Sequence, residues 1–263
     1  MIGAIIGDIV GSVYEFNNVK SKRFKWFAKG CGITDDTVLT LAVADALLDI
    51  ATAQNEREFR ELLIDKFHYH AKNHPACGFG ATFLSWVANQ QRKPYNSFGN
   101  GSAMRVSPVA YAATTLEEAL YLARLSAEVT HNHPDGIKGA ECVAGAVFLA
   151  RKGHGKEDIR AFAEKYYDLS FTLREIRPEY KYEISCQKSV PQAIAAFLEA
   201  RDFKDTIANA VSIGGDSDTI AAIAGSVAGA YYPIPERLRK KAFSYLDLEG
   251  SDIALRFEEK FIR

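Results

Sequence analysis

The chain has 263 residues, of which 48% are apolar and 25% are charged, and its formal net charge at pH 7 is −1. This length and composition supply a sizeable core for one large domain or two small ones. A net charge near zero gives no overall basic surface for nucleic acid or for an anionic membrane. The cysteines are widely spaced and include no CxxC pair, so we expect free thiols in a reducing compartment at Cys31, Cys77, Cys142 and Cys186.

The N-terminal residues 2–14 predict a first helix with the sequence IGAIIGDIVGSVY. Its three glycines, at i, i+4 and i+8, form one stripe along which another helix or a ligand can approach closely. Asp8 interrupts the apolar run, which lacks a basic start and is too short to span a bilayer. We therefore expect a cytoplasmic protein without a membrane segment. Glu15 follows at the C-terminal end of the helix, where the dipole disfavours a carboxylate; it is either a solvated surface residue or a group with a compensating cation or function.

Two acidic motifs each precede an apolar run of helical length. The motif GGDSDT at 214–219 precedes IAAIAGSVAGA, and the motif ITDDT at 33–37 precedes VLTLAVADALLDI. Both runs predict tightly packed, buried helices that begin with paired carboxylates. Helix capping explains one such motif, because Asp, Ser and Thr are favoured at helix N-termini. Two copies are better explained by a cluster of oxygen ligands that binds Mg²⁺, Mn²⁺ or Ca²⁺ rather than zinc.

The remaining chain also has the periodicity of helices, and no segment alternates like a strand. A polar, basic loop over 17–32 is either a lid over an anionic ligand or a solvated connection, and residues 169–189 are irregular. Pro191 is expected at a helix start, and two short helices are expected after the PIP sequence at 233–235. Further helices are predicted at 34–50, 56–72, 116–128, 137–153, 156–166 and 205–214. The sequence therefore predicts an all-α fold with one compact domain.

Two groups of histidines and one loop are further candidates for a site. His68, His70 and His74 lie near the end of the helix predicted at 56–72, and we expect them at the surface because i, i+2 spacing does not place two ligands on one helix face. The loop at 98–102 runs into a helix, where backbone N–H groups can hold a phosphate. The turn THNHPDG at 130–136 holds histidines that are either turn residues or ligand contacts.

Five segments, in this order, resemble the motifs of the ADP-ribosylglycohydrolase family, which includes dinitrogenase reductase-activating glycohydrolases and ADP-ribosyl-acceptor hydrolases. They are IIGDIVGSVYEF, ITDDT, FGNGSAMRVSP, THNHPDGIKGA, and SVPQAIAAFLEA with IGGDSDTIAAIAGSVAGA. The resemblance covers nearly the whole chain. It implies a single all-helical domain over residues 1–263, with two divalent cations, Mg²⁺ or Mn²⁺, in a cleft.

The resemblance also implies a role for each candidate residue by its position in these motifs. Glu15 matches the family's catalytic or gating glutamate. One ion would be held by Thr34, Asp35 and Asp36, and the other by Asp216 and Thr219, with Asp218 bridging both. Ser102 and the backbone amides of its loop would face the diphosphate, and Phe98 would stack on adenine. The implied substrate-binding residues are Phe98, Asn100, Gly101, Ser102, Met104, Arg105 and His131.

The reaction implied is hydrolysis of the bond from the anomeric carbon of ADP-ribose to an acceptor, with ADP-ribosylated proteins or ADP-ribose derivatives as substrates. Nucleic acid would be bound only as an ADP-ribosylated substrate. Some arginine-specific members carry an Asp in the segment aligned with 75–82, which here is PACGFGAT and has no acid, so the acceptor stays open. Either Glu15 or a metal-bound hydroxide would serve as the base.

Two other functions are compatible with parts of the sequence. A haloacid dehalogenase-type phosphatase has a DxDxT motif after a buried strand near the N-terminus, whereas here the frame is DSDTI at 216–220 and follows a helical pattern. A non-catalytic ADP-ribose-binding or structural relative is the second alternative. The intact acidic motifs and Glu15 favour an enzyme over that relative.

Overall fold

The computed structural model describes residues 1–262, apart from the side chain of Thr52. Over this range the secondary structure is helical, and the only β pairing among these residues is an isolated bridge between Gly99 and Ser185. The predicted all-α class is confirmed. The helices are α1 (Ile2–Gly11), η1 (Ser12–Tyr14), α2 (Asp35–Leu48), η2 (Ile50–Thr52), α3 (Glu56–Asn73), α4 (Ala81–Ala88), α5 (Gly101–Met104), α6 (Val109–Ala112), α7 (Leu116–Glu128), α8 (Pro134–Arg151), α9 (Lys156–Ala163), α10 (Leu173–Ile176), α11 (Cys186–Leu198), α12 (Phe203–Ile213), α13 (Ser217–Tyr231), α14 (Glu236–Phe243) and α15 (Leu248–Phe261).

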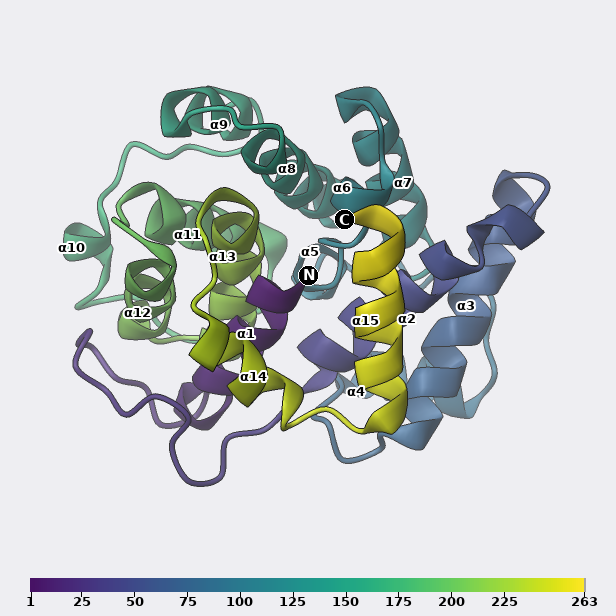
Figure 1. Ribbon diagram of the computed structural model, residues 1–263, viewed down its shortest axis with the longest axis horizontal. Helices are drawn as coiled ribbons and strands as arrows, with labels where there is room; N and C mark the ends of the chain where they lie inside the picture. The colour runs from purple at the N-terminus through teal and green to yellow at the C-terminus, as the bar shows by residue number, and fades with distance from the viewer. Residues whose placement is uncertain (263) are drawn as a thin grey trace.

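Helices α1 and α13 pack antiparallel at the centre of the domain, and the glycine stripe of α1 makes their contact possible (Figure 1). A Cβ atom at Gly7 would lie 2.0 Å from the carbonyl oxygen of Ala221, and one at Gly11 would lie 2.5 Å from the Cα of Asp218. No residue with a side chain fits there without separating the helices. This close packing brings the end of α1, where Glu15 follows, next to the acidic start of α13.

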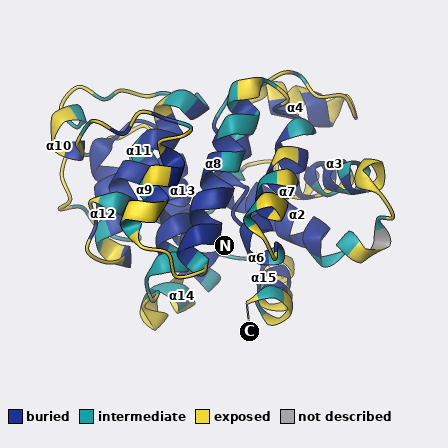
Figure 2. Ribbon diagram, turned by 90° about the horizontal axis from the view of Figure 1, so that it is seen from above, coloured by how far each residue is buried: buried dark blue, intermediate teal, exposed yellow. Residues whose placement is uncertain are grey.

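The other helices enclose this pair from two sides. Helices α8, α11 and α12 pack against α13, whereas α2 packs between α1, α3 and α15 (Figure 1). Residues 36–47 of α2 and 217–228 of α13 are buried throughout, as predicted for both apolar runs. Figure 2 shows these helices as the buried centre, with exposed residues on the outer helices and loops. Within the described range no helix is both long and apolar enough to cross a membrane.

Several local predictions are corrected by the structure. Pro191 lies inside α11 and not at its start, because the chain already turns into the helix at Cys186, whose N–H donates to the Phe98 carbonyl at 3.1 Å. The helix then loses one backbone hydrogen bond at the proline. The segment 169–189, expected to be irregular, contains α10, whose Thr172 and Glu175 form a capping box.

Three more differences concern the histidines of α3, the last helix and helix α4. His68 and His70 are buried and not at the surface: His70 Nε2 lies 3.1 Å from the Asp45 carboxylate, and His68 packs edge-on against Trp86. The last helix, α15, has 14 residues and is not short. Helix α4 was not expected, since its residues form part of a segment dominated by glycines and turns.

Candidate functional site

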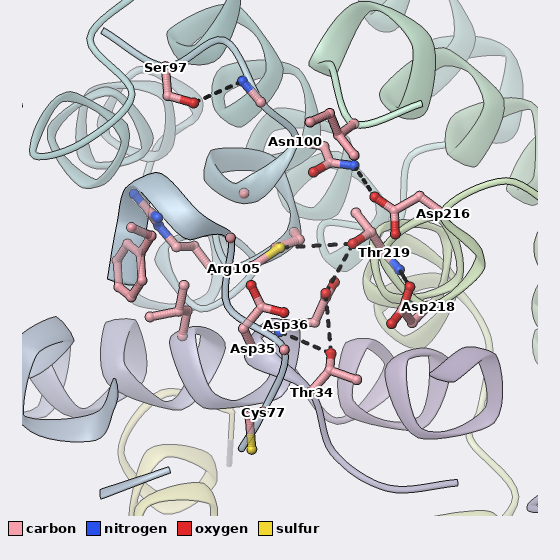
Figure 3. Close-up of a pocket in the computed structure, with 18 of the residues that line it drawn as sticks. Thr34, Asp35, Asp36, Cys77, Ser97, Asn100, Arg105, Asp216, Asp218 and Thr219 are labelled. Carbon is pink, nitrogen blue, oxygen red and sulfur yellow. Dashed lines mark hydrogen bonds between the residues drawn. The ribbon is translucent and has the colours of Figure 1, made fainter. Parts of the chain in front are cut away.

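A cavity of about 550 Å³ opens where the N-termini of α2 and α13 meet the loop before α5. Five carboxylates line it, from the end of η1, from α2 and from the start of α13: Glu15, Asp35, Asp36, Asp216 and Asp218. Among the described lining residues Arg105 is the only lysine or arginine. Figure 3 shows the side chains of Asp35, Asp36, Asp216 and Asp218 gathered around Thr219. A cavity of this size fits a small organic ligand.

The carboxylates of Glu15, Asp216 and Asp218 form one cluster. Each offers an oxygen within 4.8 Å of the others, in a group suited to hold a metal ion. Asp216 is the N-cap residue of α13 but makes no capping hydrogen bond; its Oδ2 instead accepts from the Asn100 amide at 2.7 Å (Figure 3). Capping therefore does not explain this acid, which an asparagine from another loop orients into the cavity.

The second acidic motif is joined to the first through hydroxyl groups. Thr219 Oγ1 donates to Asp36 Oδ2 at 3.0 Å, and Thr34 Oγ1 lies 3.4 Å from the same oxygen (Figure 3). The other oxygen of Asp36, Oδ1, is buried without a hydrogen-bond partner in the described structure. A buried carboxylate oxygen without a donor is costly unless a cation compensates it. Thr219, predicted to serve the ion at Asp216, thus contacts the acid of the opposite motif.

Asp8 is a residue of the site that was predicted only as part of a family motif, without a role. Its carboxylate is fully buried and accepts from Thr34 N at 3.0 Å, Thr34 Oγ1 at 2.8 Å and Thr37 N at 3.1 Å, as well as from Thr37 Oγ1. These four bonds fix the first turn of α2 and thereby orient Asp35 and Asp36. The sequence signal for this role was an acidic residue inside an apolar helix, because a buried carboxylate needs hydrogen-bond donors.

The acidic residues of the site all have raised pKa values, and burial is the largest cause in each. The pKa of Asp8 rises to about 6 and that of Glu15 to about 7, where repulsion from Asp216 adds to burial. Burial and neighbouring carboxylates raise the pKa values of Asp35, Asp36 and Asp218 well above their ordinary range. Without cations such a site retains protons. An oxygen-only donor set with raised pKa values and an orphaned buried oxygen fits divalent cations such as Mg²⁺ or Mn²⁺.

These shifts predict how the stability of the metal-free protein depends on pH. A carboxyl group whose pKa is higher in the folded than in the unfolded protein stabilises the fold at low pH, and this contribution is lost as pH rises through the folded value. For Asp8 and Glu15 this stabilising contribution is lost as pH rises from about 4 to about 7. We expect the melting temperature in EDTA to fall between pH 5 and pH 8, and Mg²⁺ to raise it more at pH 8. Thermal melts at both pH values check this; equal Mg²⁺ shifts would contradict it.

The residues predicted to bind substrate divide into two groups. Asn100, Gly101, Met104, Arg105 and His131 line the cavity, although Arg105 is fully buried behind its wall. Two others do not line it. The Ser102 hydroxyl donates to the Gly136 carbonyl at 2.7 Å, and the Phe98 ring is 51% exposed and packs edge-on against His133. The assignments of Ser102 to the diphosphate and of Phe98 to adenine stay predictions.

Two residues beside Glu15 were missed from the sequence. The Tyr182 hydroxyl donates to Glu15 Oε1 at 3.2 Å, and its ring stacks on Phe16. The Asn18 amide donates to the Glu15 carbonyl at 2.8 Å and accepts from Gly215 N at 2.6 Å. Asn18 therefore ties the Glu15 segment to the loop before Asp216. Both residues lie in polar loops without periodicity, which gave no signal of these contacts.

Comparison with known proteins identifies the family. A model of the family described as ADP-ribosylglycohydrolase matches residues 1–261. The chain belongs to the ADP-ribosylglycohydrolase family. It is accordingly an enzyme that hydrolyses ADP-ribose linkages. Family membership also agrees with the order of the sequence motifs and with the cavity to which they contribute.

Individual relatives of this ADP-ribosylglycohydrolase support the assignment over most of the chain. It is 28% identical to human ADP-ribosylhydrolase ARH3, with 96% of this chain and 90% of the human protein covered. It is 25% identical to the ADP-ribosylarginine hydrolase Tri1 of Pseudomonas putida (strain GB-1), with 93% of this chain and 73% of Tri1 covered. A solved structure named "ADP-ribosylglycohydrolase-related protein complex" superposes with a TM-score of 0.71 at 24% identity, covering 99% of this chain and 97% of that one, and supports the fold.

Proposed function

We propose that this enzyme cleaves the glycosidic bond between ADP-ribose and an acceptor with the help of two divalent cations, Mg²⁺ or Mn²⁺, and so reverses ADP-ribosylation. The observation that carries the proposal is the convergence of five carboxylates on one cavity with a single, buried arginine. Such a concentration of like charge is stable when cations neutralise it. The cavity volume also suits part of a nucleotide-sized ligand.

We assign the oxygen ligands to two cation positions. Glu15, Asp216 and Asp218 would hold one ion, and Thr34, Asp35 and Asp36 the other. Asp218 interacts with the charges of both groups, which supports its bridging position. When bound, the ions would orient ribose hydroxyls and stabilise negative charge on oxygen. Asp8 and Asn100 act behind these ligands, since they hold the α2 turn and the Asp216 carboxylate in place.

Glu15 is the best-placed group to take a proton from the attacking water. It is half-buried and lines the cavity beside the carboxylates that would hold the ions. The Tyr182 hydroxyl donates to Oε1 of Glu15 and so orients the carboxylate in the cavity. The proton that Glu15 takes from the water would then pass to the acceptor as its bond to the anomeric carbon breaks.

Two observations bear on the identity of the acceptor. ARH3 and Tri1 are both relatives, and Tri1 is named for ADP-ribosylarginine. The lining segment 76–82 contains no acid that could pair with a guanidinium, which favours an acceptor other than arginine. We therefore propose that the acceptor is linked through a hydroxyl or carboxyl oxygen and is not arginine.

A panel of substrates tests this function. We expect release of ADP-ribose from ADP-ribosylated serine peptide or O-acetyl-ADP-ribose with Mg²⁺ or Mn²⁺, loss of release in EDTA, and no recovery with Zn²⁺, because the ligand set is oxygen only. ADP-ribosylarginine and ADP-ribosylated nucleic acid ends complete the panel, and chromatography of free ADP-ribose is the measurement. Full turnover by protein verified to be metal-free would refute the role of the cations, and binding of ADP-ribose without turnover of any substrate would favour a non-catalytic reader.

A further inference from the structure

The contacts behind the cavity wall assign a role to two residues that do not contact the ligand. We propose that Arg105 and Thr130 are positioning residues that hold His131 in the neutral tautomer protonated at Nε2, so that an N–H donor faces the cavity. Only the identity of the ligand, an ADP-ribose group, rests on the proposed function. The tautomer itself is a property of the free protein.

Arg105 is an unusual buried cation. It is 0% exposed, its guanidinium lies 4.4 Å from the centre of the Phe67 ring, and its Nη2 donates to the Ser126 carbonyl at 3.0 Å and to Thr130 Oγ1 at 2.8 Å. Within residues 1–262 no carboxylate lies within ion-pairing distance of it, and its Nε and Nη1 are buried without partners. A buried cation with no counter-ion exerts its full field on its neighbours.

The Thr130 hydroxyl connects this cation to His131. The hydroxyl is fully buried, and its Oγ1 lies 2.8 Å from His131 Nδ1. A hydroxyl has two lone pairs and one proton, and the Arg105 N–H occupies one lone pair. The remaining lone pair and the proton both lie within reach of His131 Nδ1, so the bond could run in either direction. The direction of the Thr130–His131 bond therefore decides the tautomer.

Two physical effects give the same direction. An imidazole nitrogen is a stronger acceptor than an aliphatic hydroxyl oxygen, so Thr130 donates its proton to His131 Nδ1. The positive charge of the Arg105 guanidinium favours a lone pair over an N–H at His131 Nδ1, the ring nitrogen that faces it through Thr130. Burial and this charge also lower the pKa of His131 well below its ordinary value, which keeps the ring neutral. The ring proton is thus on Nε2.

Two glycines lie beside the Nε2 atom, and because they have no side chains they leave it open to the cavity. A Cβ atom at Gly101 would lie 3.1 Å from Nε2, and one at Gly99 would lie 3.6 Å from it. His131 lines the cavity. A neutral N–H there can donate to a phosphate or hydroxyl oxygen without burying a further charge. The same tautomer directs the acceptor nitrogen away from the cavity, so His131 is not the general base.

The test removes the Thr130 hydroxyl and observes the ring directly. In the wild-type protein with Mg²⁺, ¹⁵N NMR of the His131 ring should show protonated Nε2 and unprotonated Nδ1. Thr130→Val keeps the side-chain shape but has no donor, so we expect a mixture of tautomers and about a tenfold loss of ADP-ribose affinity, the usual size of one hydrogen bond. Thr130→Ser should restore both. Ser126→Ala is the control, because it removes a buried hydroxyl from the residue whose backbone carbonyl accepts from Arg105, and it leaves this carbonyl and Thr130 in place.

Each outcome decides a separate claim. A wild-type ring protonated at Nδ1, or a Thr130→Val protein with unchanged tautomer and affinity, would overturn the positioning role. If Thr130→Val does not fold, the wild-type spectrum alone decides the tautomer. A ring protonated at Nε2 in a protein without affinity for ADP-ribose would support the tautomer and refute the proposed ligand. If Ser126→Ala loses as much affinity as Thr130→Val, the effect of Thr130→Val comes from altered packing and not from the hydrogen bond to His131.

Discussion

Asp218→Asn is expected to have opposite effects on stability with and without cations. The Asp218 carboxylate is buried and is repelled by Asp216, Asp36 and Glu15. Removing its charge relieves this repulsion, so in EDTA the variant should melt at or above the wild-type temperature. With Mg²⁺ the wild type gains stability from binding, and the variant should gain little, because binding to the folded state stabilises it in proportion to affinity.

The same variant should be nearly inactive. Loss of a ligand shared by two ions removes several kcal/mol of charge stabilisation, which corresponds to a rate lower by at least about 10² at fixed Mg²⁺. Asp35→Asn is the matched comparison, since Asp35 lines the cavity but is only partly buried. Calorimetry should show a larger loss of affinity for Asp218→Asn than for Asp35→Asn. Two ions bound to Asp218→Asn at wild-type affinity would exclude the bridging role.

The parts of the site that the sequence predicted are those with a local signal. The two acidic motifs could be placed at helix starts because apolar runs of helical period follow them, and the structure brings Asp36 and Asp218 to one cavity. The glycine stripe predicted a close approach to α1 and so anticipated its contact with α13, although it did not say which helix would pack there. Composition and periodicity were also sufficient for the all-α class.

The parts that were missed depend on contacts between distant segments. Burial of His70 requires Asp45, and the orientation of Asp216 requires Asn100, 116 residues away. Ser102 and Phe98 do not line the cavity, because a motif predicts the path of a loop but not the direction of each side chain. Ser102 turns toward the Gly136 carbonyl, because a buried hydroxyl takes the nearest free acceptor.

Glu15→Gln is expected to separate catalysis from folding. Gln has nearly the size of Glu and keeps the Oε1 acceptor for the Tyr182 hydroxyl, but it cannot take a proton. Glu15 is half-buried and no cavity is created, so the free energy of unfolding should stay within about 1 kcal/mol of the wild type in EDTA. The hydrolysis rate should fall by at least about 10², the usual contribution of a general base.

The pH dependence of Glu15→Gln identifies which role the carboxylate has. If Glu15 is the base, the wild-type rate rises with pH through its pKa in the loaded enzyme, which bound cations move below the cation-free value of about 7. The Gln variant should lack this rise while ADP-ribose still binds at the loop that contains Asn100. Tyr182→Phe is the matched control, because it removes the hydrogen bond to Glu15 and leaves the carboxylate in place. We expect it to keep the rise. A Gln variant with wild-type rate and pH profile would assign proton transfer to water alone and leave Glu15 as a metal ligand.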